Sequence, residues 1–185
     1  MSQLSKIMEF NQNFVEKKEY EAYLTSRYPD KKMIIITCMD TRLVELLPKA
    51  MNFKNGDVKV IKNAGAIISS PFGSVMRSVM VALYELDADE VIVVGHYECG
   101  MASLNADNMI NHIKERGVSE QVLSTLENSG IKLTEWLRGF DNVEDGVIQT
   151  VELIRQHPLL PPGIPVHGMI IDPATGALDL VTEGY

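Results

Sequence analysis

Four short runs of aliphatic, mostly β-branched residues constrain most strongly how this chain can fold. The runs lie at 33–37, 58–61, 91–94 and 166–171, and polar residues do not alternate regularly within them. Strands of this kind are covered on both faces, as in parallel sheets. Segments with helical signals separate the runs. The sequence therefore predicts an α/β fold with a mostly parallel central sheet of about four to five strands, flanked by helices.

The first 28 residues carry a helical pattern. Leu4, Ile7, Phe10 and Phe14 fall at helical spacing, with lysines and glutamates between them. Residues 1–28 are therefore predicted to form an N-terminal helical arm. Its apolar face requires a surface to lie on, and that surface belongs either to the same domain or to a second subunit.

Further helix and turn signals follow along the chain. A second helix is predicted from Ser69 to Leu86, with so small a polar face that it should be buried in the core or at an interface. A third is predicted to begin at Asn142 and to end before Pro158. Residues 172–176, Asp-Pro-Ala-Thr-Gly, are typical of a turn and predict a C-terminal hairpin.

Size and composition exclude several classes of function. With 185 residues, the chain is predicted to form a single domain, residues 1–185. A net charge of −8 argues against nucleic acid as a partner, because binding phosphates requires a basic surface. The apolar runs are too short to span a membrane, and the N-terminus does not match a secretory signal. A cytoplasmic protein with two reduced cysteines is expected.

Both cysteines follow predicted strands closely. Cys38 ends the first run, and the third run leads into His96 and Cys99. Open α/β sheets gather ligand-binding residues at the carboxyl ends of their strands, so these three side chains meet if the two strands are neighbours. Two thiolates and one imidazole suit Zn²⁺, and a set of three protein ligands leaves a fourth position free, as in catalytic zinc sites.

The residues after Cys38 suggest what controls that fourth position. Asp40 lies close enough in sequence to reach the metal, and Arg42 can hold its carboxylate in a two-pronged ion pair. Held by Arg42, Asp40 leaves room for water; released, it can become the fourth ligand and switch the site off. Two simpler interpretations stay open: packing cysteines with an ordinary capping ion pair, or a regulatory disulfide between Cys38 and Cys99.

At these residues the sequence resembles the β-class carbonic anhydrases, and most of all their short, archaeal-type branch. The Cys-x-Asp-x-Arg motif appears at residues 38–42, the His-x-x-Cys-Gly motif at 96–100, and an Asn-Ala-Gly turn at 63–65. Two positions depart from the family pattern: Lys62 replaces an arginine before the turn, and Met101 replaces a second glycine.

The resemblance implies a zinc enzyme that interconverts CO₂ and bicarbonate, as a homodimer or a multiple of dimers. It also implies zinc ligation by the two cysteines and His96, a catalytic Asp–Arg pair, and a substrate pocket that includes Asn63, Ala64, Gly65 and Gly100. Two alternatives remain: hydrolysis of a related small molecule such as carbon disulfide or carbonyl sulfide, and a non-catalytic, dimeric zinc-binding module.

Overall fold

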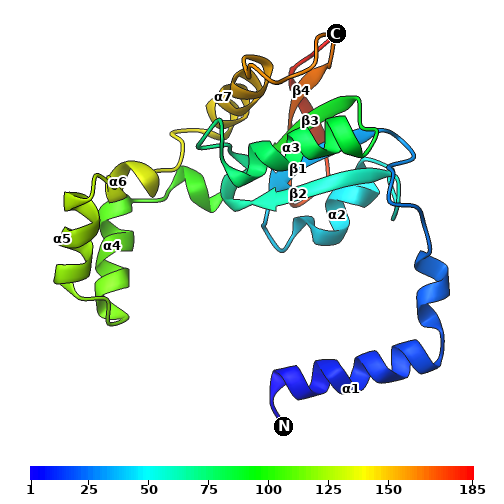
Figure 1. Cartoon of the computed structure of the whole chain (residues 1–185), viewed down its shortest axis with the longest axis horizontal. Coiled ribbons are helices and arrows are strands. Elements are labelled where there is room, and N and C mark those ends of the chain that lie inside the picture. The colour runs from blue at the N-terminus through cyan, green and yellow to red at the C-terminus, as the bar shows by residue number, and fades with distance from the viewer.

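The computed structural model describes the whole chain, residues 1–185, and a five-stranded sheet lies at its centre (Figure 1). The strand order is β2-β1-β3-β4-β5; the first four strands are parallel, and β5 is antiparallel to β4. The strands are β1 Met33–Cys38, β2 Val58–Asn63, β3 Glu90–His96, β4 Val166–Ile171 and β5 Leu178–Thr182. The predicted fold class, the four strands and the C-terminal hairpin are confirmed.

The two central strands carry the core, whereas one predicted buried strand is an edge strand. Residues of β1 and β3 are almost all buried, because each strand has neighbours on both sides and helices on both faces. The prediction that β2 is covered on both faces is wrong, since its Val60 is 46% exposed. Lys59 and Lys62 were the sequence signal, because lysines protect edge strands from pairing with other chains.

Helices cover both faces of the sheet. α3 (Ser74–Glu85) and α7 (Val143–Arg155) share one core cluster with alternate residues of β1 and β3. α2 (Leu43–Ala50) packs on the opposite face, in a second cluster that includes Cys38 and Cys99. The metal-binding candidates therefore belong to the α2 side of the sheet, at the carboxyl ends of its central strands.

Two helix predictions are tested at their boundaries. α7 begins as predicted, because the side chain of Asn142 accepts a hydrogen bond from the Asp145 N–H. α3 begins later than predicted, since the N–H of Gly73 bonds to Ser70 O in a turn before the helix. Only one stripe of α3 is buried and Val81 is exposed, so burial of the helix in the core of its own chain is wrong, whereas burial at an interface stays a prediction.

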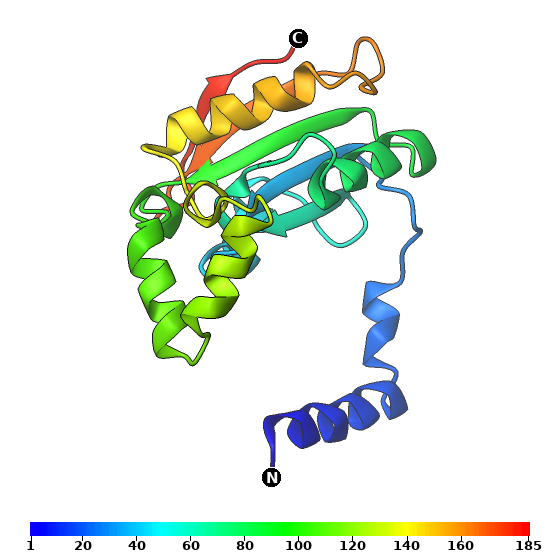
Figure 2. The same ribbon diagram turned by 60° about the vertical axis from the view of Figure 1, so that its left-hand side comes forward.

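Two helical segments project away from the sheet (Figures 1 and 2). The first comprises α1 (Gln3–Glu16) and a short 3₁₀ turn (Glu19–Tyr23); Lys18, in a left-handed conformation, ends the helix well before residue 28. No residue of α1 is buried, which contradicts docking of its apolar face on its own domain. The second projection is a helical lobe of three helices: α4 Ala106–Glu115, α5 Glu120–Asn128 and α6 Leu133–Trp136. None of the helices has the length and apolar character needed to cross a membrane.

Candidate metal centre

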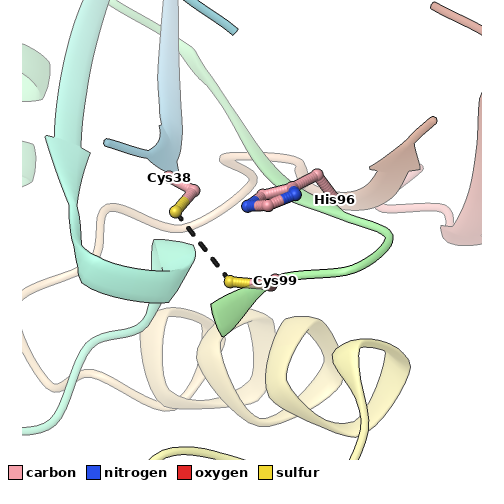
Figure 3. A group of neighbouring side chains, drawn as sticks. All are labelled: Cys38, His96 and Cys99. Atoms are coloured by element: carbon pink, nitrogen blue, oxygen red, sulfur yellow. Dashed lines mark hydrogen bonds between the residues drawn. The ribbon is translucent and has the colours of Figure 1, made fainter. Parts of the chain in front are cut away.

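Cys38, His96 and Cys99 meet at the end of the sheet (Figure 3). Cys38 is the last residue of β1 and His96 the last of β3, and these two strands are parallel neighbours. Cys99 follows in the loop after β3. Their ligand atoms all lie within 4.8 Å of one another, and all three residues are buried. The predicted convergence is therefore observed.

The geometry of this cluster suits a tetrahedral metal ion. The two sulfur atoms are 3.9 Å apart, which is far from the ~2.05 Å of a disulfide bond. Two thiolates at ~2.3 Å from one tetrahedral Zn²⁺ would be separated by about 3.8 Å. A regulatory disulfide is therefore not formed in this structure, and the sulfur spacing already fits a shared metal ion.

His96 presents a free ring nitrogen to the two sulfurs. Its Nδ1 lies 2.8 Å from the carbonyl oxygen of Tyr97, which fixes the ring and leaves Nδ1–H as the donor. Its Nε2 is buried without any hydrogen-bond partner, although the residue is only 1% exposed. A buried polar atom without a partner is costly, so this nitrogen indicates a missing ligand. The residues present therefore fit a zinc ion.

The protonation of the two thiols supports the same conclusion. The hydrogen bond between their sulfurs lowers the pKa of Cys38 to about 4 and raises the pKa of Cys99. The N–H of Gly65, 3.4 Å from the Cys38 sulfur, also favours a thiolate there. The first proton thus leaves readily, whereas the second leaves only when a cation offsets the additional buried charge.

A tight turn after β2 closes over Cys38. Gly65 has a φ of +83°, and a Cβ on it would lie 2.9 Å from Met101 Cγ and 3.0 Å from Phe140 Cε1. Only glycine fits this combination of left-handed backbone and close packing. The turn therefore brings the Gly65 N–H close to the Cys38 sulfur, which explains why glycine occupies the third position of Asn-Ala-Gly.

Asp40 lies beside the cluster and is held by Arg42. Its Oδ1 accepts hydrogen bonds from the backbone N–H of Arg42 at 2.8 Å and from Nε at 3.1 Å, and its Oδ2 accepts from Nη2 at 2.9 Å. The Arg42 side chain lowers the pKa of Asp40 to about 2. Oδ2 also lies 3.7 Å from His96 Nε2, so the carboxylate faces the cluster without belonging to it.

The residues predicted to line the substrate pocket are only partly together. Asn63 and Ala64 line a cavity of about 780 Å³ that also touches Trp136 of the helical lobe. Gly65 and Gly100 do not line this cavity. Gly65 is buried in the turn that closes over Cys38, and Gly100 has open space around it.

Sequence reasoning missed two contacts in the loop after β3. The side chain of Glu98 lies 3.3 Å from Arg42, and the hydroxyl of Tyr97 donates to Asp179 of β5 at 2.8 Å. The position of Tyr97 and Glu98 inside the His-x-x-Cys motif was the only sequence signal of a role in the site, because Arg42 and Asp179 lie far from them in the sequence.

Comparisons with known proteins agree on one family. Residues 33–178 match the family model described as carbonic anhydrase. A Bacillus subtilis protein named "Putative carbonic anhydrase YtiB" is 55% identical over 185 residues, which are 100% of this chain and 99% of that protein. The crystal structure of β-carbonic anhydrase isoform I from Trichomonas vaginalis superimposes with a TM-score of 0.89, at 33% identity and 100% coverage of both chains. A carbon disulfide hydrolase from Acidithiobacillus thiooxidans is 26% identical over 80% of this chain and 76% of its own length.

Proposed function

Because the chain belongs to the β-carbonic anhydrase family, we propose that it catalyses the zinc-dependent, reversible hydration of CO₂ to bicarbonate and a proton. The observation that carries this proposal is the buried Cys38–His96–Cys99 cluster, with the unpartnered Nε2 of His96 facing two sulfurs 3.9 Å apart. A carboxylate fixed beside the cluster adds a group that can orient water.

The two cysteine sulfurs and His96 Nε2 would hold the zinc ion. Bound there, Zn²⁺ would act as a Lewis acid and would make water a nucleophile near neutral pH, as zinc does in carbonic anhydrases in general. The Tyr97 carbonyl oxygen holds the other ring nitrogen of His96, which keeps the Nε2 lone pair directed at the sulfurs.

Asp40 is proposed to orient the attacking water. With a pKa of about 2, its carboxylate stays ionised at neutral pH. It therefore accepts a hydrogen bond from water and does not act as a general base that becomes protonated. Arg42 occupies Oδ1 and one side of Oδ2. The remaining lone pair of Oδ2, on the side of His96, is therefore free to accept a hydrogen bond from water.

Arg42 also decides between two positions of Asp40 in this proposal. Four hydrogen bonds from Arg42 hold the carboxylate in place and would leave the fourth metal position for water. Released from Arg42, Oδ2, which lies 3.7 Å from His96 Nε2, would be able to become the fourth ligand. Asn63, Ala64, Gly65 and Gly100 are proposed to shape the approach of the small, uncharged substrate.

The proposal is tested by stopped-flow CO₂ hydration on protein of known zinc content. Wild-type protein should hydrate CO₂, and Asp40→Asn should keep its zinc but lose about 10²-fold or more in kcat, the range for a positioned acid–base or oxyanion group. Asp141→Asn, a carboxylate on the exposed surface, is the matched control and should leave kcat unchanged. Undiminished hydration by Asp40→Asn would rule out this role of the carboxylate.

Two other functions share this site. The similarity to a carbon disulfide hydrolase favours testing carbon disulfide and carbonyl sulfide beside CO₂. Faster turnover of either sulfur compound would replace CO₂ as the proposed substrate. A non-catalytic zinc module would bind zinc and leave all three substrates unchanged at every pH.

We also propose that residues 1–185 form one domain that assembles as a homodimer or a multiple of dimers. α1 exposes Leu4, Ile7 and Phe10 on one face, and none of its residues is buried against its own sheet. A second copy of the chain would bury this face. Two free thiols at the site favour a reducing compartment, so the cytoplasm is the proposed location.

A further inference from the structure

Arg42 contacts a second carboxylate that the proposed chemistry does not use. Its Nη1 lies 3.3 Å from Oε2 of Glu98, while Nε and Nη2 contact Asp40. Glu98 lies between His96 and Cys99 in the loop after β3. We propose that Glu98 is a positioning residue that fixes Arg42 and, through it, the carboxylate of Asp40; its catalytic consequence rests on the proposed function.

The guanidinium of Arg42 contacts two different segments of the chain, Asp40 with one edge and Glu98 with the other. Arginine presents its N–H donors in a rigid planar fork, so a contact on one edge restricts the orientation of the other edge. Asp40 and Arg42 belong to the same short segment after β1 and can move together. Glu98 is 56 residues further along the chain, so its contact ties this pair to the segment that joins His96, at the end of β3, to Cys99.

The backbone at Glu98 adopts an unusual conformation. Its φ is +55°, a left-handed conformation that residues with a Cβ adopt only at an energetic cost. The loop requires this turn, because both His96 and Cys99 must face Cys38 within four residues. Glycine would adopt it without strain. Glutamate at this position makes the contact with Arg42, which glycine could not make.

Because the Glu98 side chain is exposed, its contact with Arg42 can position that side chain without contributing much to the stability of the fold. The Glu98 side chain is 81% exposed, and such ion pairs contribute little to fold stability. An exposed charged contact changes an equilibrium by about fivefold at most. We therefore expect Glu98→Gln to lower kcat by about two- to fivefold, with zinc content, KM for CO₂ and the unfolding midpoint unchanged.

The experiment is a double-mutant cycle on the zinc-loaded, full-length protein. The kcat for CO₂ hydration is measured for wild type, Glu98→Gln, Arg42→Met and the double variant. The loss caused by Glu98→Gln should disappear in the Arg42→Met background. Glu120→Gln is the control, because Glu120 is 82% exposed and pairs with Lys114 at 3.0 Å on the helical lobe. An equal loss in both backgrounds, or no loss at all, would overturn the proposal.

A second measurement does not depend on CO₂. The Nε–H of Arg42 donates to Asp40, so its exchange with water, followed by ¹⁵N NMR, reports directly on that bond. Exchange should be faster in Glu98→Gln and unchanged in Glu120→Gln. If wild-type protein does not hydrate CO₂ while Glu98→Gln still releases this proton, the proposed function fails and the positioning role stands. If CO₂ is hydrated and neither readout responds to Glu98→Gln, the positioning role fails alone.

Discussion

The packing of α7 on β3 leaves no room for a methyl group at Gly95, immediately before His96. A Cβ there would lie 2.7 Å from Val147 Cγ2 and 2.8 Å from Val143 Cγ2. Overpacking of this kind costs about 1–3 kcal/mol. The backbone of Gly95 is not left-handed, so alanine recovers about 0.4–1 kcal/mol by restricting the unfolded chain. Gly95→Ala should therefore destabilise the fold by about 1–2 kcal/mol.

A compensating change tests whether this contact is the cause. Val147→Ala alone removes two buried methyl groups and should cost about 2 kcal/mol, at ~0.8 kcal/mol per group plus a cavity term. In the double variant the new methyl group at position 95 no longer meets Val147 Cγ2, and only the contact with Val143 Cγ2 remains. The combined loss should then be smaller than the sum by about 1 kcal/mol. Urea unfolding of the zinc-loaded proteins, followed by circular dichroism, measures this coupling. Additive losses, or a neutral Gly95→Ala, would refute the packing argument.

Three further predictions concern the metal, the acid range and the arm. Cys38→Ser, His96→Ala and Cys99→Ser should each lose bound zinc by atomic absorption, and full occupancy in all three would exclude the ligand set. Because Arg42 lowers the folded-state pKa of Asp40 from 3.8 to about 2, the ionised carboxylate stabilises the fold above pH ~4, and this contribution disappears as the pH falls towards 2. Acid unfolding of metal-free wild type should therefore show a loss of stability in this window that Asp40→Asn lacks; identical curves would contradict the ion pair. Phe10→Glu on the exposed face of α1 should shift the protein to monomers in analytical ultracentrifugation without changing its far-UV spectrum, and an unchanged sedimentation coefficient would exclude α1 from the interface.

Local patterns in the sequence were sufficient for most of the fold. Apolar runs predicted the strands, and Asn142 predicted the start of α7, because both signals lie within a few residues of the element they describe. The start of α3 was missed, since Ser70 and Pro71 resemble a helix start but form a turn that ends at Gly73. Such turns compete with helix starts by using the same residue types.

The sequence also predicted which side chains form the candidate metal centre, on the condition that β1 and β3 are neighbours. Cys38 and His96 end buried strands and Cys99 follows in the next loop, and parallel strands that are neighbours bring such residues together. What the sequence did not contain was the order of the strands. That β2 is an edge, with Val60 exposed, follows from its having a neighbour on one side only, and Lys59 and Lys62 are the only local sign of this in the sequence.

Tertiary structure alone decided the remaining features of the site. The unpartnered Nε2 of His96, the closure of Gly65 over Cys38 and the contact of Glu98 with Arg42 all join segments far apart in the chain. Periodicity in a sequence records whether a side chain is buried. It does not record which distant side chain lies opposite, because that depends on how the whole sheet is assembled.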